Sequence, residues 1–332
     1  MSGRCVFKPR KADNKLGSPV VSIVTPSLNQ AKFLPWAIES VLSQPYAPLE
    51  YWVMDGGSQD GTAEILRAYG KSLRWVSEPD AGQADAVNRG WQQSRGEILG
   101  WVNADDGLLP RAVPEVVKAF AAHPDAAVVY GRCLVMNRFG KPVGEYPAAP
   151  FSLERLLEEV DNFIPQPATF VRRSAAEAVG WLDTDLYYVM DYDFWLRLAT
   201  AGYEFVYLPK PLAFLRLHGE SKTGGASSGF AEELVRVFTV LDEAGDLPKE
   251  PKRRARTWGL VYYRAARYLF WGGQPGEART YLRRARESCP SLKASRGFAL
   301  LTAATSLGRF GYSLASFLYG NPFVHWRGKP NG

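Results

Sequence analysis

Two adjacent carboxylates, Asp105 and Asp106, have the chemistry and placement to hold a divalent cation on a diphosphate. They end the segment Asn103-Ala104-Asp105-Asp106, which follows an apolar run and precedes Pro110. Hard cations such as Mg²⁺ take a few carboxylate oxygens together with phosphate oxygens and water. One acid could instead cap a helix that begins after Pro110, but a cap does not need two acids. The segment is therefore a candidate metal and diphosphate site.

Three more polar clusters follow short apolar runs and could complete a nucleotide site. They span residues 25–29 (Thr-Pro-Ser-Leu-Asn), 55–58 (Asp-Gly-Gly-Ser) and 78–80 (Glu-Pro-Asp). Asp55 can accept hydrogen bonds from a base or ribose, and the glycines after it let the backbone approach a ligand closely. Each cluster alone could be a turn, because Asp, Gly and Ser are common turn residues. Four such clusters at one sheet edge indicate a binding site.

A second pair of acids, Asp191 and Asp193, flanks Tyr192 before an amphipathic stretch. A carboxylate whose pKa is raised by burial, or one held near an acceptor hydroxyl, can act as a general base. The alternative is that these acids cap the helix that follows, and at least one of them does so. His218 is one of three histidines, and the nearby segment 221–223 (Ser-Lys-Thr) could contact an anion. A lone histidine is otherwise commonly structural.

These clusters need a scaffold, and the first 130 residues predict alternating strands and helices. Expected strands span 20–25, 49–54, 73–77, 97–102 and 126–130, and expected helices span 33–43, 60–69, 83–94 and 110–121. This alternation predicts a Rossmann-like, mostly parallel α/β sheet whose ligands bind beyond the carboxyl ends of the strands. No G-x-G-x-x-G follows the first strand and no phosphate-binding P-loop is present, which argues against NAD-binding and P-loop NTPase domains.

The rest of the chain predicts an appendage to this α/β domain. We expect an N-terminal arm over 1–18, a catalytic domain over 19–225 and a helical, basic region over 226–332. Residues 258–288 resemble one tetratricopeptide-style helical hairpin, with Ala265 and Ala278 where the helices touch. One such repeat cannot form a solenoid, so we expect it to pack on the catalytic domain.

Composition predicts a globular cytoplasmic protein. Hydrophobic residues make up 46% and charged residues 22% of the 332, which is ordinary for a folded soluble chain. The N-terminus lacks the apolar run of a secretory signal, and no clean stretch of about 20 apolar residues could span a bilayer. The three cysteines are scattered and predict neither a disulfide framework nor a metal site.

The net charge of +6 conceals a basic C-terminal part, where 15 Lys and Arg after residue 250 face two Glu. Such a tail could contact an anionic inner membrane leaflet, helped by an amphipathic stretch over 297–319. Its apolar residues are Leu300, Ala304, Leu307, Leu314 and Leu318. The alternatives are a solvated basic face and an apolar stripe packed on the protein itself. No recognised nucleic-acid module is present, so we expect no nucleic-acid partner.

The chain resembles family-2 glycosyltransferases, the large inverting family with the GT-A fold. Seven stretches between about residues 20 and 223 carry the resemblance, in the family's order: VSIVTPSLNQAKFLPWAIESVLSQ, LEYWVMDGGSQDGT, SEPDAGQADAVNRGW, GEILGWVNADD, IPQPATFVRR, MDYDFWLRLA and LRLHGESKT. The resemblance implies an inverting single displacement.

The resemblance also implies a role for each matching residue. Asp191 would be the catalytic base. Asp105 and Asp106 would hold Mg²⁺ or Mn²⁺ on the diphosphate, and His218 would reach the metal or diphosphate from a closing loop. The nucleotide site would comprise Thr25, Pro26, Ser27, Asn29, Asp55, Gly57, Asp80, Asn103, Ala104 and Asp105. The acceptor side would comprise Gln166, Asp193 and Trp195.

Two positions depart from the family pattern. Asn103 stands where the acidic triplet usually begins with Asp, and Met190 replaces the acid before the base. They motivate an alternative, a nucleotide-sugar-binding protein with impaired catalysis. The Gln-x-x-Arg-Trp signature of processive members is absent, so we expect single-residue addition. The expected activity transfers a sugar from a UDP-sugar to a saccharide or lipid-linked saccharide acceptor in cell-surface polysaccharide biosynthesis.

Overall fold

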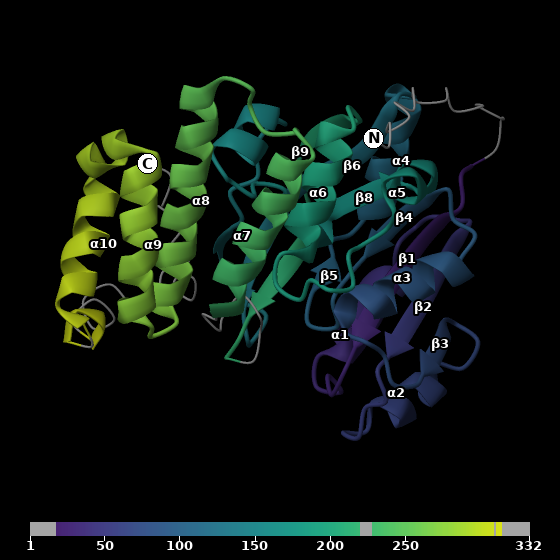
Figure 1. The fold of residues 1–332 in the computed structure, drawn as a ribbon. Helices are drawn as coiled ribbons and strands as arrows, with labels where there is room; N and C mark the ends of the chain where they lie inside the picture. The colour runs from purple at the N-terminus through teal and green to yellow at the C-terminus, as the bar shows by residue number, and fades with distance from the viewer. Residues whose placement is uncertain (1–17, 220–227, 309, 314–332) are drawn as a thin grey trace.

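The computed structural model describes residues 18–219, 228–308 and 310–313. Nearly all of the expected N-terminal arm lies outside these residues, as do the segment 221–223 and the positions Leu314 and Leu318. Within the described residues the centre is a mixed sheet in the order β3-β2-β1-β4-β8-β6-β9-β5, with β7 paired to β6 (Figure 1).

The first half of the sheet is the parallel α/β unit that the sequence predicts. Strands β2, β1 and β4 lie side by side in parallel, and β3 extends the sheet beyond β2. The expected strands and helices of this half are confirmed, with ends that shift by a few residues. They are β1 (Val21–Ser27), α1 (Leu34–Leu42), β2 (Leu49–Asp55), α2 (Thr62–Tyr69), β3 (Arg74–Ser77), α3 (Gln83–Gln93) and β4 (Ile98–Trp101).

The second half is mixed, which the strand-and-helix alternation did not show. Strand β8 (Thr169–Arg172) enters between β4 and β6 and runs antiparallel to both. The strand expected over 126–130 is β6 (Ala126–Asn137), which continues well past its predicted end and pairs in parallel with β9 (Glu204–Leu217). Two short strands complete the sheet, β5 (Gly107–Leu108) on β9 and β7 (Pro142–Glu145) on β6. The sheet is thus parallel over β3-β2-β1-β4 and mixed beyond.

Each face of the sheet is covered by helices over its own apolar core. Alternate residues of β1 point to opposite faces, with Val21 and Ile23 in one core and Val24 in the other. Helix α1 and helix α4 (Ala112–Ala122) pack on the first face. Helices α3, α5 (Arg173–Val179) and α6 (Met190–Thr200) pack on the second. A π-helical turn (Glu154–Glu158) and a 3₁₀ turn (Gln166–Ala168) connect β7 to β8.

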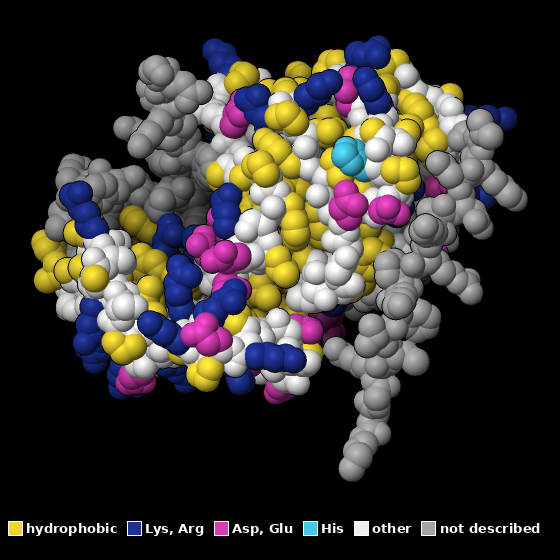
Figure 2. Space-filling model, turned by 90° about the horizontal axis from the view of Figure 1, so that it is seen from above, with side chains coloured by type: hydrophobic (Ala, Val, Ile, Leu, Met, Phe, Trp, Pro, Cys, Tyr) yellow, Lys and Arg dark blue, Asp and Glu magenta, His cyan; other side chains and the backbone are white. Residues whose placement is uncertain are grey.

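The C-terminal part is helical, as the sequence predicts. It contains α7 (Ser228–Glu243), α8 (Pro251–Trp271), α9 (Pro275–Ser288), a 3₁₀ turn (Pro290–Ala294) and α10 (Arg296–Ser306). Helices α8 and α9 form the expected hairpin, and both Ala265 and Ala278 are fully buried in its core. Figure 2 shows Lys and Arg side chains gathered over this end of the molecule.

Helix α7 joins this part to the α/β domain. Its residues Leu234, Val237 and Phe238 belong to the same apolar core as helix α6. The Tyr192 and Phe238 rings lie 6.2 Å apart between centroids. The expected domain boundary near residue 225 falls outside the described residues and stays a prediction.

Candidate active site

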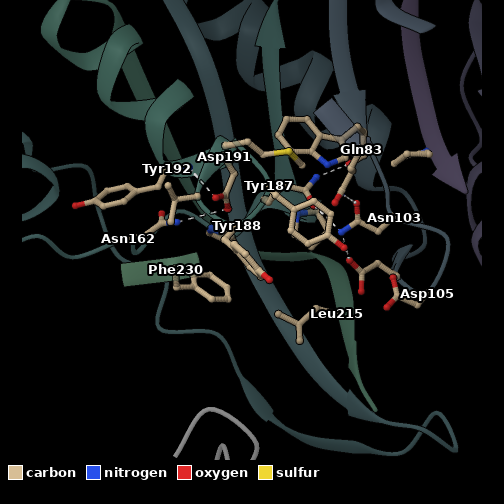
Figure 3. Close-up of a pocket in the computed structure, with 18 of the residues that line it drawn as sticks. Gln83, Asn103, Asp105, Asn162, Tyr187, Tyr188, Asp191, Tyr192, Leu215 and Phe230 are labelled. Carbon is tan, nitrogen blue, oxygen red and sulfur yellow. Dashed lines mark hydrogen bonds between the residues drawn. The ribbon is translucent and has the colours of Figure 1, made fainter. Parts of the chain in front are cut away.

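A cavity of about 760 Å³ lies beyond the carboxyl ends of the parallel strands. Segments that follow β1, β3 and β4 form one wall, the segment from 160 to 167 and the start of α6 form another, and helices α7 and α8 close it. Figure 3 shows Asp191 toward one side of this cavity and Asn103 and Asp105 toward the other. The position agrees with the rule that ligands bind at the carboxyl edge of an α/β sheet.

Six of the predicted nucleotide residues line this cavity: Pro26, Ser27, Asp80, Asn103, Ala104 and Asp105. The Ser27 hydroxyl is buried and has no hydrogen-bond partner among the described residues, so it is available to a ligand. Burial raises the pKa of Asp80, and the charges of Asp85 and Asp55 raise it further. The N–H of Gly82 donates to Asp80 Oδ1 over 2.9 Å and fixes this carboxylate at the cavity wall.

The other four predicted nucleotide residues do not line this cavity. Thr25 is fully buried and shares a 2.9 Å hydrogen bond with Tyr51. Asp55 is 2% exposed and accepts hydrogen bonds from Ser58 and Ser77. These side chains therefore shape the strand ends and do not face the cavity.

Asn29 and Gly57 shape the loops at the same edge. Both have positive φ, 53° and 84° respectively. Asn29 Oδ1 accepts from the Gln59 N–H over 3.0 Å, and the Asn29 N–H donates to Ser58 Oγ over 2.7 Å. These bonds tie the loop after β1 to the loop after β2.

Asn103 is the centre of an amide network. Its Oδ1 accepts from Gln83 Nε2 over 2.6 Å, and its Nδ2 donates to Asp106 Oδ2 over 3.0 Å and to Gln166 Oε1 over 3.1 Å. Gln166 also lines the cavity and donates to the Trp101 carbonyl over 2.7 Å. An Asp at position 103 could not make the two donations, because an ionised carboxylate only accepts. The presence of Asn at position 103, where the family usually has Asp, therefore has a structural reason.

The two adjacent acids have different surroundings. Asp106 is 5% exposed, and its Oδ1 accepts from the Arg216 N–H over 3.0 Å. Burial raises the pKa of Asp106 well above its usual range, and the charge of Asp105 adds to the rise. Asp105 instead faces His218, whose Nε2 lies 2.9 Å from Asp105 Oδ2. The predicted pair thus divides into one buried acid and one acid paired with the predicted histidine.

Strand β9 brings His218 to this place. The His218 ring packs against Phe33 with 4.5 Å between ring centroids. Arg216 precedes it, and its Nε donates to the Asp105 carbonyl over 3.1 Å. Arg216 lines the cavity, and its Nη2 is buried without a hydrogen-bond partner among the described residues. The sequence motifs did not single out this donor, which a phosphate oxygen could satisfy.

Asp105 and His218 fit a divalent cation of the Mg²⁺ or Mn²⁺ type. The described residues hold no group of three or more acids, histidines or cysteines arranged around a metal position. A carboxylate oxygen and an imidazole nitrogen can still supply part of a ligand set, and such cations take the remainder from phosphate and water. A cation here would also offset the repulsion between Asp105 and Asp106.

Asp191 lies in the first turn of α6, at the cavity wall. Its Oδ1 accepts from the Tyr192 N–H over 2.7 Å, and Asn162 Nδ2 lies 3.5 Å from its Oδ2. The N-cap of α6 is Val189 and no side chain makes a cap hydrogen bond there, so the expectation that Asp191 or Asp193 caps this helix is wrong. The placement of Asp191 at the cavity wall fits the catalytic interpretation, which stays a prediction. Met190, just before it, is 5% exposed in the apolar core, where an acid would be costly to bury.

Two predicted acceptor-side residues do not reach the cavity. Asp193 forms an ion pair with Arg197 over 2.7 Å, and its pKa is raised by burial. Trp195 is fully buried one turn beyond Asp191 and stacks on Trp101 with 6.0 Å between centroids. Both side chains hold α6 in place, and Gln166 alone of the three lines the cavity.

A glutamate on α7, which no motif pointed to, fixes the segment before Asp191. Glu233 accepts from three successive N–H groups, those of Tyr187 (2.8 Å), Tyr188 (2.7 Å) and Val189 (3.0 Å). Gly229 allows this approach, since a Cβ there would lie 2.1 Å from the Tyr188 ring. The C-terminal helices are thus part of the site.

Replacing Glu233 by Gln is expected to lower kcat by about tenfold to a hundredfold, with a smaller effect on the donor KM. Gln offers one acceptor oxygen for three N–H groups, so the start of α6 shifts, and small displacements of catalytic groups cost rates of this order. Steady-state kinetics of sugar transfer would measure the change. Glu232→Gln, at an exposed neighbouring position, is the matched control. Equal rates for the two variants would contradict a positioning role.

The fold is that of the GT-A class, and solved glycosyltransferase structures share it. One is S. aureus TarS residues 1–349 in complex with UDP-GlcNAc, with a TM-score of 0.62 and 17% identity over 90% of this chain and 91% of that one. Another is the mannosyltransferase PcManGT of Pyrobaculum calidifontis in complex with GDP-Man and Mn²⁺, with a TM-score of 0.58 and 17% identity over 91% and 88%. At these identities the likeness concerns the fold.

Sequence comparison gives the family of part of the chain. Residues 22–180 match the model described as glycosyl transferase family 2, so this stretch of the chain is a domain of that family. An uncharacterized glycosyltransferase of Mycobacterium tuberculosis is 28% identical over 264 residues, 77% of this chain and 95% of that protein. The chondroitin synthase of Pasteurella multocida is 29% identical over 207 residues, 61% of this chain and 21% of that protein.

Proposed function

We propose that this chain is an inverting, non-processive glycosyltransferase that uses a UDP-sugar. Its acceptor is a saccharide or lipid-linked saccharide in cell-surface polysaccharide biosynthesis. One observation carries the proposal: a single cavity holds Asp191 on one side and Asp105, paired with His218, on the other. The UDP-GlcNAc bound to the TarS structure and the chondroitin synthase relative support the choice of donor and pathway.

The residues divide the reaction between them. Ser27 and Asp80 offer a hydroxyl and a carboxylate to the nucleoside, and Arg216 offers a guanidinium to the diphosphate. Asp105 and His218 would hold Mg²⁺ or Mn²⁺, which, when bound, neutralises the leaving diphosphate. Asp191 takes the proton of the acceptor hydroxyl. The hydroxyl oxygen attacks the anomeric carbon as the bond between that carbon and the diphosphate breaks. Attack opposite the leaving group inverts the anomeric configuration.

Release of UDP from UDP-sugars separates this proposal from a catalytically impaired binding protein. We expect UDP release from UDP-glucose or UDP-GlcNAc with Mn²⁺ and a return to background in excess chelator, with GDP release from GDP-mannose measured for comparison. The amide network of Asn103 and the buried position of Met190 support the enzyme. Nucleotide-sugar binding without release or transfer under any condition would favour the impaired protein.

We also propose that the protein attaches peripherally to the anionic cytoplasmic face of a membrane. No helix in the described residues is long and apolar enough to cross a bilayer. Helix α10 packs Phe298 and Leu301 into the protein. The inward face of α10 is therefore not the apolar stripe that the sequence predicted. Leu300, Leu307 and Phe310 are instead 59%, 55% and 69% exposed, on a basic part of the chain. Exposed apolar side chains beside basic ones suit an anionic interface.

Changing Leu300, Leu307 and Phe310 together to Ser is expected to abolish flotation with vesicles that contain phosphatidylglycerol. The three side chains are exposed, so the fold and the thermal unfolding temperature should be retained. Vesicles of phosphatidylcholine alone test whether negative charge is needed. Equal flotation of the triple variant and the unmodified protein would contradict membrane attachment through α10.

A further inference from the structure

The wall that helices α7 and α8 add to the cavity differs from the nucleotide side. It carries Phe230 and Leu234 from α7, and Arg264, Arg267 and Tyr268 from α8. The same cavity is lined by Asp191, which has to reach an acceptor hydroxyl. This wall is therefore placed to contact the acceptor and not the nucleotide.

Four aromatic rings form a continuous track that begins in the segment before α6 and continues along the α7 and α8 wall. Ring centroids lie 4.8 Å apart for Tyr187 and Tyr188, 4.6 Å for Tyr188 and Phe230, and 4.8 Å for Phe230 and Tyr268. All four residues line the cavity. Such rings bury a large apolar area and lose little conformational freedom on binding, which suits the apolar face of a sugar ring.

Two arginines lie beside this track. Arg264 and Arg267 are three residues apart on α8, so they share one face of the helix. The pKa of Arg267 is lowered by burial and, in addition, by the nearby charge of Arg264. An anion bound between Arg264 and Arg267 would offset the repulsion between these two like charges at the cavity wall.

The acid that lies near Arg264 is already shared with another arginine. Arg264 Nη2 lies 3.8 Å from Asp161 Oδ1, while Asp161 Oδ2 accepts from Arg155 over 2.6 Å. Arg253, earlier on the same helix, forms an ion pair with Glu158. Arg256 lies 3.8 Å from Glu159. Arg253 and Arg256 do not line the cavity, whereas Arg264 and Arg267 do.

We propose that the acceptor is a saccharide with an acidic group, a carboxylate or a phosphate ester, bound with its sugar on the aromatic track and its acid at Arg264 and Arg267. Guanidinium groups bind both kinds of oxyanion through charge-assisted hydrogen bonds. The inference rests on the proposed function, because the acceptor hydroxyl must reach Asp191.

Matched pairs of saccharides test the proposal on the full-length protein by calorimetric titration. One pair is a hyaluronan tetrasaccharide and its carboxyl-reduced form, and the other is a mannobiose 6-phosphate and mannobiose. We expect the acidic member of at least one pair to bind at least about tenfold tighter than its neutral partner. The pair that shows the preference identifies the acid as a carboxylate or a phosphate.

Arg264→Gln and Arg267→Gln should each remove most of this preference, and Tyr268→Ala should weaken both members of the pair. Arg256→Gln, on the same helix but outside the cavity, is the matched control and should retain the preference. Arg264 is a third exposed, so its variant should fold even if the Arg267 variant does not. Equal binding within both pairs, no binding of any probe, or a preference that survives in Arg264→Gln would overturn the proposal.

UDP release in the presence of Mn²⁺, measured without acceptor, is a separate readout of the proposed function. A preference for acidic saccharides without UDP release would leave the acceptor site standing and reject the transferase. UDP release without such a preference would do the reverse.

Discussion

Asp191→Asn is expected to lower kcat for sugar transfer by about 10²–10⁴, the usual contribution of a general base, with little change in donor binding. Asn keeps an oxygen that can accept from the Tyr192 N–H, so this hydrogen bond in the first turn of α6 is retained. It cannot take a proton from the acceptor hydroxyl. Steady-state transfer kinetics, together with calorimetric titration of UDP and Mn²⁺, would separate the two effects.

Asp185→Asn is the matched control for this variant. Asp185 is an exposed acid six residues earlier in the chain, paired with Arg236 over 3.1 Å. Its variant should retain the unmodified rate. Transfer by Asp191→Asn at the rate of Asp185→Asn would reject Asp191 as the base and leave the acid only its hydrogen bond to the Tyr192 N–H.

The parallel half of the sheet could be predicted because local patterns determine it. Strand β1 is rich in β-branched residues, and polar clusters follow the strand ends where a ligand would bind. The position of β8 could not be predicted in this way. This four-residue strand runs antiparallel to both β4 and β6 and pairs with each of them. No local sequence pattern indicates which strands become neighbours.

The roles of adjacent residues were the least predictable part of the site. Asp105 and Asp106 are equivalent by type and spacing, yet the Arg216 N–H holds Asp106 in a buried position while Asp105 faces His218. Only the folded chain brings residues from β9 to this turn. Thr25 and Asp55 also matched the family pattern, yet their side chains do not line the cavity. In the folded chain they bond to Tyr51 and Ser77, which the sequence pattern does not reveal.

Glu233 carried no signal in the sequence, and the arginines of α8 were recognised only as part of a basic region and not as site residues. The helical pattern after residue 231 predicted a packing role, and packing does account for α9 and its buried alanines. A site residue on an amphipathic helix has the same spacing as a solvated one. Only contact with the segment 187–189 distinguishes Glu233 from its neighbour Glu232.

Asp105→Asn is expected to lower kcat by about a hundredfold or more and to raise the Mn²⁺ concentration needed for half-maximal activity. Stabilisation of a leaving diphosphate by a cation is worth several kcal/mol, and each 1.36 kcal/mol corresponds to about tenfold in rate. The amide retains a neutral oxygen near His218 but loses the charge that attracts the cation. A Mn²⁺ titration of the initial rate at saturating donor would measure both changes.

Thermal unfolding gives a second, activity-independent measurement of the same site. UDP at about a hundred times its dissociation constant should stabilise the unmodified protein by about 2.7 kcal/mol. We expect Mn²⁺ to strengthen that stabilisation in the unmodified protein but not in Asp105→Asn. Asp106→Asn is the informative comparison. Asp106 is buried against Arg216, so its substitution should lower folding stability more than it changes the response to Mn²⁺. An unchanged Mn²⁺ response in Asp105→Asn, with a lost response in Asp106→Asn, would exchange the two roles and place the cation on the buried acid.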